Sequence, residues 1–158
     1  MQLYKLTDQS LQTHGGFQWT AGQPVRTSGT GDLCGPGFIH DYTDPYLALL
    51  LNPINANISD PRLFRGEGTI GKTECGLKVG CTTFTLREEM PVPLVTLDHR
   101  IHFAILCALD VSSLWQSAEF IAWAENWLSG EDRSEAAAEA AAEAAAGAAG
   151  ATEIDLIS

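Results

Sequence analysis

The sequence predicts an α+β fold, in which a mainly antiparallel sheet with a short helix is followed by two C-terminal helices, the last of them alanine-rich. Two observations predict this class. Segments rich in β-branched and aromatic residues recur through the first 90 residues and are separated by glycine-rich stretches. Beyond residue 112 the composition changes to strong helix formers. We therefore expect an α+β domain over residues 1–112 and a helical C-terminal region over residues 113–158.

The strand predictions rest on side-chain periodicity and composition. Residues 3–7, LYKLT, alternate apolar and polar side chains, as a half-buried strand does. Residues 62–68 and 77–86 are rich in β-branched and aromatic side chains and predict two further strands. Residues 14–24 and 29–40 are dense in glycine, so we expect turns and irregular segments there.

A short buried helix is predicted after Asp44, because Asp44 is a good N-cap and Pro45 suits the first helical position. Its apolar run closes at Asn52 and Pro53, where we expect the helix to end. Residues 88–97 contain two prolines in three residues, which excludes a helix and predicts an extended segment. Residues 100–111 form an apolar segment that we expect to be buried, and the pattern leaves its type open.

Two helices are predicted in the C-terminal region, each from a capping pattern. Ser113 and Gln116 form a capping box ahead of a tryptophan-rich helix, which we expect to be largely buried and to end at Ser129 and Gly130. Asp132 begins a second box, with glutamate three residues later, that opens the alanine-rich helix. An alanine face costs almost no side-chain entropy to bury. We expect this helix to pack against a neighbouring subunit or the tryptophan-rich helix, with a solvated tail as the alternative.

The charge balance is strongly acidic, with 9 Lys and Arg against 20 Asp and Glu and a net charge of −11. A field of this sign repels nucleic acid and anionic membranes, so we expect neither as a partner. The N-terminal residues lack the pattern of a signal peptide, and no apolar stretch approaches the roughly 20 residues that span a bilayer. We therefore expect a soluble protein of the cytoplasm.

The four cysteines are expected to be reduced thiols in that compartment. Their spacing contains no C-x-x-C pair. Cys34 with His40, Cys75 with Cys81, and His99 with His102 could each supply half of a zinc site, but structural zinc usually takes closely spaced ligand pairs. Buried thiols are the better interpretation, and we expect no metal.

Residues 66–73, GEGTIGKT, match the phosphate-loop pattern G-x-x-x-x-G-K-[ST]. A working phosphate loop lies between a buried parallel strand and a helix. Here the residues that follow are strand sequence with two further glycines, and too little chain remains for alternating strands and helices. The same objection applies to the dinucleotide pattern of Gly66, Gly68 and Gly71. We interpret the stretch as a glycine-rich hairpin loop between antiparallel strands, with an accidental match.

An ordered series of short motifs runs through most of the chain: LYK, HGG followed by Trp19, LCGPGFIH, GLKVGCT, and WLSGEDRS leading into alanine repeats. The series resembles a group of small, uncharacterised bacteriophage and prophage proteins with a glycine-rich N-terminal domain and an alanine-rich C-terminal helix. The resemblance implies a viral accessory protein that works in the cytoplasm of a bacterial host. It implies no established activity and transfers no catalytic residue.

The favoured functional hypothesis is non-catalytic binding of a small nucleotide-like ligand, as in the sequestration of a signal used for host defence. Glycine lets a ligand approach the backbone, aromatic rings stack on nucleobases, and histidine and basic side chains bind phosphate or ribose. No cofactor is expected and no catalytic residue is assigned. The candidate ligand-binding residues are His14, Gly15, Gly16, Trp19, His40, Tyr42, Arg65, Lys72, Thr73 and Lys78.

Two other classes of function remain open. LYK, the histidine–glycine pair and GFIH before a proline-started helix loosely resemble the small nicotinamide-binding domain of ADP-ribosyltransferases. That resemblance implies Glu88 or Glu89 as the catalytic carboxylate, with His14 and Tyr42 contacting the dinucleotide. The third hypothesis is a structural or inhibitory protein that binds a basic partner through its acidic C-terminal helix, since residues 129–158 hold seven acidic side chains and one basic. The C-terminal helices are also the expected site of homo-oligomerisation.

Overall fold

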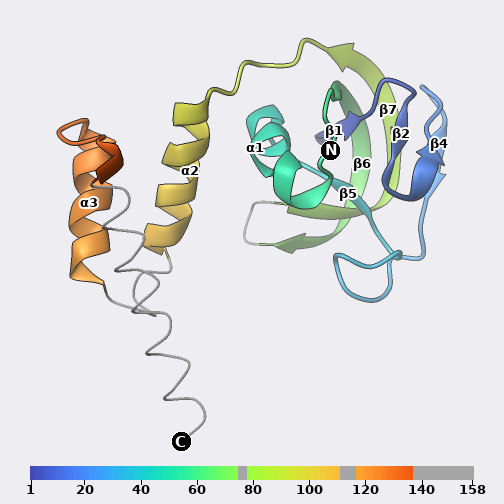
Figure 1. The fold of residues 1–158 in the computed structure, drawn as a ribbon. Coiled ribbons are helices and arrows are strands. Elements are labelled where there is room, and N and C mark those ends of the chain that lie inside the picture. Colours follow the sequence, from blue (N-terminus) through green and yellow to red (C-terminus); the bar gives the residue numbers. More distant parts are fainter. Residues whose placement is uncertain (75–77, 111–116, 137–158) are drawn as a thin grey trace, which may run out of the picture. The chain divides into compact units, whose positions relative to one another are not determined.

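The computed structural model describes residues 1–74, 78–110 and 117–136 and confirms the α+β class (Figure 1). The chain divides into two compact units, residues 1–95 and residues 96–158. The first contains the sheet and one α-helix, and the described part of the second contains two α-helices. The division lies after Val95, earlier than the predicted boundary at residue 112, because residues 97–110 form a helix that packs with the helix after it.

The N-terminal unit is built on an antiparallel sheet with the order β1 (Gln2–Thr7), β6 (Arg62–Glu74), β7 (Lys78–Met90) and β4 (Pro24–Arg26). A fifth strand, β5 (Ile39–Asp41), also pairs with β7.

The sheet curls back toward its own edge (Figure 1). One bridge between Tyr4 and Tyr42, with backbone N···O distances of 2.8 and 2.9 Å, joins β1 to the end of β5. The inner face holds the core, whose buried members include Leu3, Ile39 and Phe84.

A small two-stranded hairpin, β2 (Gln12–Thr13) and β3 (Phe17–Gln18), is joined by a 3₁₀ turn, η1 (His14–Gly16). The strand β4 begins at Pro24, at the end of the segment expected to be only turn and loop. The other glycine-rich segment is irregular up to Phe38, and its last residues enter β5 because their alternate side chains fit the sheet interior.

The GEGTIGKT stretch lies inside β6, so the prediction of a hairpin loop at residues 66–73 is wrong, although the antiparallel hairpin itself is present. The glycines are needed because the neighbouring strand and side chains leave no room for a Cβ atom. A Cβ on Gly66 would lie 2.3 Å from Cζ of Phe84, and one on Gly71 would lie 2.9 Å from Phe38. The ladder also slips at three points in this strand. Residues 75–77, which join β6 to β7, lie outside the described residues.

The predicted helix is present as α1 (Pro45–Asn55), and Asp44 caps it by accepting from the backbone N–H groups of Tyr46 and Leu47. It runs past Pro53, three residues beyond the predicted end at Asn52. Asn52 closes the helix from within: its carbonyl accepts from the amides of residues 56 and 57, and its side chain exchanges two hydrogen bonds with the backbone of Ile58.

The C-terminal unit contains α2 (Leu97–Asp110) and α3 (Ala118–Ser129), which share a small apolar core of Ile105, Phe120, Ala124 and Trp127. The tryptophan-rich helix was expected to be largely buried, and residues 100–111 were expected to be a buried segment of open type. In the described part of the unit, only one face of each helix is buried. Figure 1 shows the two helices side by side.

The ends of α3 are defined by two residues. Ser117 caps the start by accepting from the backbone N–H of Phe120 at 3.2 Å, whereas the predicted box at Ser113 and Gln116 lies outside the described residues. Gly130 ends the helix as predicted, in the left-handed conformation with φ of 85°. The alanine-rich helix expected after Asp132 also falls outside the described residues from position 137 onward.

Candidate functional site

The predicted ligand-binding residues do not converge on one pocket. His14, Gly15 and Gly16 form the exposed tip of the β2–β3 hairpin, where both glycines have positive φ. Trp19 follows the hairpin but is buried in the core, 3% exposed. Thr73 lies exposed on β6, opposite Val79.

Three other predicted residues hold the loop formed by residues 27–38. Lys72 Nζ donates to the carbonyl of Gly31 at 2.5 Å, and a ring nitrogen of His40 bonds to the carbonyl of Leu33. Lys78 Nζ donates to the Cys34 thiol at 3.1 Å. Burial lowers the pKa of His40. The basic set around the glycine-rich strand therefore anchors a loop of the protein itself.

Tyr42 is buried, and its hydroxyl accepts a hydrogen bond from the Asn55 amide at 3.0 Å. Burial raises the pKa of this phenol. The carboxylates of Glu88 and Glu89, the proposed catalytic groups of the transferase hypothesis, bind Arg65 and Arg62 respectively. Tyr42 and these carboxylates are thus all engaged by neighbouring side chains.

A charged pair that was not among the predicted site residues lies inside the sheet. Lys5 on β1 and Asp41 on β5 are 6% and 0% exposed, with Nζ 3.3 Å from Oδ1 of Asp41. The same ammonium donates to the carbonyl of His40 at 2.7 Å. These contacts lie beside the Tyr4–Tyr42 bridge, so the Lys5 side chain helps close the seam between β1 and β5.

The described residues do not satisfy every hydrogen-bonding group of the pair. An ammonium can donate three hydrogen bonds, and Lys5 makes two with the described residues. Oδ2 of Asp41 accepts none from a nitrogen or oxygen donor of those residues. The thiol of Cys81, a weak donor, interacts with this carboxylate. Unsatisfied buried polar groups are rare in native structures, and each calls for an explanation.

Burial sets the protonation behaviour of this cluster. It raises the pKa of Asp41, and the ammonium of Lys5 opposes the rise. Burial and the nearby Asp41 carboxylate together raise the pKa of Cys81 to about 12, so the thiol stays protonated and unreactive. The cluster therefore offers hydrogen bonds and charge, and it contains no activated nucleophile among the described residues.

Aromatic rings form the walls around Lys5. Its Nζ lies 4.9 Å from the ring centre of Trp19 and 5.8 Å from that of Phe84. Trp19 meets Phe84 edge to face at 5.8 Å and meets the exposed Phe17 in the same way at 5.1 Å. The indole N–H of Trp19 donates to Thr13 Oγ1 at 3.0 Å, so the hairpin carries one wall of the cluster.

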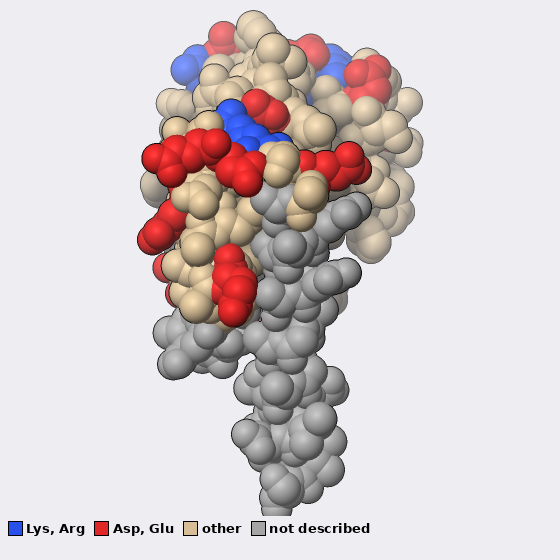
Figure 2. Space-filling view, turned by 60° about the vertical axis from the view of Figure 1, so that its left-hand side comes forward, with Lys and Arg blue, Asp and Glu red and all other residues tan. Residues whose placement is uncertain are grey.

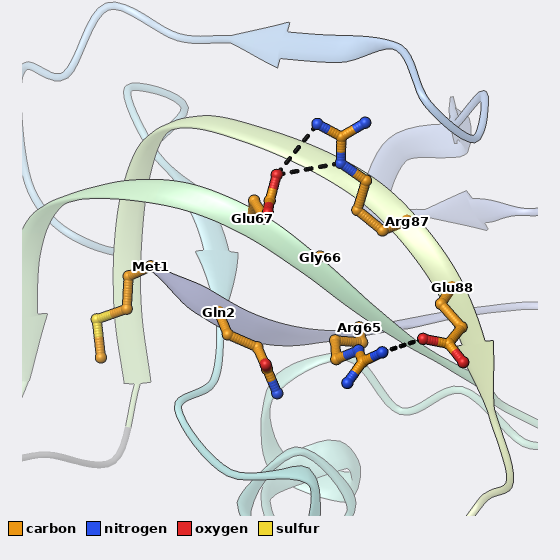
Figure 3. A pocket seen from close by; sticks show the side chains of 7 residues that line it. All are labelled: Met1, Gln2, Arg65, Gly66, Glu67, Arg87 and Glu88. Atoms are coloured by element: carbon orange, nitrogen blue, oxygen red, sulfur yellow. Dashed lines mark hydrogen bonds and ion pairs between the residues drawn. The ribbon is translucent and has the colours of Figure 1, made fainter.

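A second feature is a surface hollow of about 500 Å³ over β1, β6 and β7 (Figure 3). Its charged side chains pair across the strands, Arg65 with Glu88 and Arg87 with Glu67, and Gly66 lies between the two pairs. Its other lining residues are Met1 and Gln2. Exposed ion pairs of this kind contribute little to stability. Because each pair is neutral overall, the hollow offers no net charge to a ligand.

The described face of the chain in Figure 2 carries more acidic than basic side chains. In the C-terminal unit Arg133 forms an ion pair with Asp98 at 3.8 Å and stacks on the ring of Trp127 at 4.5 Å. In the part of the chain that the structure describes, no helix is long and apolar enough to cross a membrane. Nor do those residues contain a cluster of three or more His, Cys, Asp or Glu suited to a metal ion.

Comparisons with protein-family models, with curated proteins and with solved structures give no match.

Sequence reasoning missed Lys5 although a signal was present. In a strand, alternate residues share a face. Leu3, Lys5 and Thr7 therefore point the same way, and all three are buried. A lysine at a core-facing strand position requires a partner, and the acidic residue next to His40 supplies it. The pairing of β1 with the end of β5, which brings the two together, has no local signature in the sequence.

Proposed function

We propose that the protein binds a small nucleotide-like ligand at the Lys5–Asp41 pair and that it does so without catalysis. The observation that carries this proposal is a buried ammonium–carboxylate pair between the rings of Trp19 and Phe84. Among the described residues, one N–H of Lys5 has no acceptor, and Oδ2 of Asp41 has no nitrogen or oxygen donor. A buried ion pair is weak evidence for stability on its own, because desolvation offsets much of its attraction.

The chemistry of the pair matches the edge of a nucleobase. Each nucleobase edge places hydrogen-bond donors beside acceptors. The Lys5 ammonium supplies the third N–H to a ring nitrogen or carbonyl oxygen, and Asp41 Oδ2 accepts from an amino or imino N–H. Aromatic side chains stack on a base with about 1–3 kcal/mol each. The site therefore has a donor, an acceptor and aromatic rings for the recognition of a base.

The ligand reaches the pair through movement of the β2–β3 hairpin. Its ladder consists of only two residue pairs, Gln12 with Gln18 and Thr13 with Phe17. At its base Leu11 has a φ of 61°, a left-handed conformation that costs a non-glycine residue on the order of 1 kcal/mol. Opening of this short hairpin breaks few ladder bonds, and its main cost is the exposure of the buried Trp19 ring. Its displacement removes Trp19 from above Lys5 and exposes the pair.

The biological setting of the proposal comes from the resemblance to small phage proteins. A phage protein that buries a nucleotide signal in a closing site would keep that signal from the defence machinery of the host. Tight burial without turnover suffices for such a role, which fits a site made of hydrogen-bonding groups and aromatic walls. Self-association through the C-terminal helices remains part of the proposal.

A thermal-shift screen tests the proposal with cyclic di- and trinucleotides, ADP-ribose, NAD, and ATP with magnesium. Ligand at 100 times its dissociation constant adds about 2.7 kcal/mol to the free energy of unfolding. For a unit of 95 residues that corresponds to a rise in melting temperature of roughly 10–20 °C. The bound compound is then released by heat and analysed, and its recovery intact is expected. Release of nicotinamide from NAD would instead favour the transferase hypothesis.

Variants of the pair locate the ligand. Lys5→Met alone leaves Asp41 buried without its cation, so it should lower the free energy of unfolding by about 3–5 kcal/mol. The double variant Lys5→Met with Asp41→Asn removes both charges and should recover most of that loss while abolishing the ligand shift. Lys72→Met is the matched control, because it deletes an exposed lysine that also bonds to a carbonyl. A double variant that folds and keeps the full ligand shift would refute the site.

A further inference from the structure

One thiol and one amine lie in contact between the loop before β5 and the start of β7, at a place that the proposed ligand site does not use. Nζ of Lys78 is 3.1 Å from Sγ of Cys34. Cys34 is exposed, whereas Lys78 is 7% exposed at the start of β7. The chain contains three lysines, and one of them, Lys78, contacts a cysteine thiol.

The loop that carries Cys34 is held by several contacts. Cys34 lies inside a turn closed by the hydrogen bond from the Gly35 amide to the Asp32 carbonyl at 2.9 Å. The residue before it, Leu33, bonds through its carbonyl to the His40 ring and packs tightly over Gly80, where a Cβ would lie 2.5 Å from its methyl group. The thiol is therefore presented to the amine by a fixed loop.

We propose that Cys34 and Lys78 form a covalent sulfur–nitrogen cross-link when the protein meets hydrogen peroxide. In the first step the thiol attacks the peroxide, an S–O bond forms, and one water leaves with the oxidised sulfur as a sulfenic acid. In the second step the nitrogen of Lys78 attacks that sulfur. The S–N bond forms, the S–O bond breaks, and the hydroxyl leaves as water with a proton from the amine.

The geometry favours this outcome over simple oxidation of the sulfur. Exposure of Cys34 admits the peroxide, and sulfenic acids condense with a nitrogen or thiol that is already in contact. Proximity converts the second step into an intramolecular reaction with a high effective concentration of amine. The product ties the loop of residues 27–38 to β7, and His40 of β5 and Lys72 of β6 also bond to that loop.

Two other cysteines of the chain serve as internal comparisons. Cys107 is exposed on α2, in a unit whose sequence contains no lysine. It should be oxidised without forming a cross-link of this kind. Cys81 is buried, and its pKa of about 12 leaves it protonated, so it should not react.

Peptide mapping of the full chain after treatment with hydrogen peroxide tests the proposal. The tryptic peptide of residues 27–62 should be joined to that of residues 73–87, with cleavage after Lys78 blocked. The joined mass should be lower than the sum of the two reduced peptides by two hydrogen atoms. Dithiothreitol should restore both peptides, because thiols reduce the S–N bond to thiol and amine while forming their own disulfide.

A disulfide from Cys34 to Cys75 would give the same mass change, so the cross-link must be shown to persist in Cys75→Ser. It should be lost in Lys78→Arg, which keeps the charge and removes the nucleophilic amine, and in Cys34→Ser, which alters only an exposed side chain. Cross-linking that disappears in Cys75→Ser would overturn the proposal. So would conversion of Cys34 to sulfenic or sulfinic acid with normal cleavage after Lys78.

Discussion

Replacing Gly66 by alanine tests whether the glycines of GEGTIGKT exist for packing. The backbone of Gly66 lies outside the left-handed region, so alanine meets no torsional obstacle there. The added Cβ would lie 2.3 Å from Cζ of Phe84 and 2.4 Å from the backbone oxygen of Thr85. Ordinary carbon contacts are about 3.5–4.0 Å, so more than an ångström of overlap must be relieved.

The expected cost follows from what can move. Phe84 is fully buried, and Thr85 belongs to the strand that pairs with Gly66 and its neighbours, so neither yields without loss of packing or ladder bonds. Overpacking of this kind costs about 1–3 kcal/mol or more. Alanine also reduces the conformational freedom of the unfolded chain, which offsets at most about 1 kcal/mol of this cost. We expect Gly66→Ala to lower the free energy of unfolding by about 2 kcal/mol, measured by urea denaturation followed by circular dichroism.

Two further variants sharpen the test. Gly22→Ala is the control, since its Cβ would meet nothing within 4 Å and the cost is only that of a left-handed alanine, about 1 kcal/mol. Phe84→Leu removes the ring atoms but leaves the clash with Thr85, so the double variant should cost less than the sum of the single ones. The packing explanation would be refuted if Gly66→Ala had the same urea midpoint as the unsubstituted protein.

Three further predictions concern the helix and the histidine of the N-terminal unit. Asp44→Ala removes the N-cap of α1 and should lower the free energy of unfolding by about 1 kcal/mol in urea, whereas an unchanged midpoint would contradict the capping role. Asn52→Ala leaves the backbone of Ile58 without two partners and should cost about 1–3 kcal/mol by the same measurement; a loss no greater than that of an exposed alanine substitution would count against it. The pKa of His40 is lowered by burial, so near pH 6.5 the folded state binds fewer protons than the unfolded state. Stability should then rise with pH through that range and fall as the solution is acidified, and His40→Gln should flatten this slope in denaturation curves taken across pH 5–8.

The parts of the fold that local chemistry determines were predictable. The alternation of residues 3–7 predicted β1. Asp44 and Pro45 predicted the start of α1, and Gly130 predicted the end of α3. Each signal acts within a turn or a strand. The glycines of residues 66–71 were misinterpreted because glycine signals a loop locally, and only the approach of Phe84 and Phe38 shows why a strand requires it.

The candidate site was less predictable, since it depends on which strands meet. Trp19 and His40 were predicted and do lie against the Lys5–Asp41 pair, Trp19 by its ring and His40 by its carbonyl. Lys5 and Asp41 are 36 residues apart in the sequence. They come together through the β-bridge between Tyr4 and Tyr42, which no sequence pattern predicts. Lys72 and Lys78 were assigned to a ligand because they are cationic, whereas in the structure they bind a loop whose course the sequence does not specify.

The position of β7 in the sheet also bears on how the chain is made. β7 pairs with β4, β5 and β6, yet it is the last strand of the sheet to leave the ribosome. Until then β4 and β5 have no β7 edge to join, and β6 offers one open edge to any other nascent chain. Long-range pairing of this kind is slow and leaves partly folded chains prone to aggregation. Production of this protein should therefore benefit more from slowed synthesis and early chaperone binding than from any change to the finished surface.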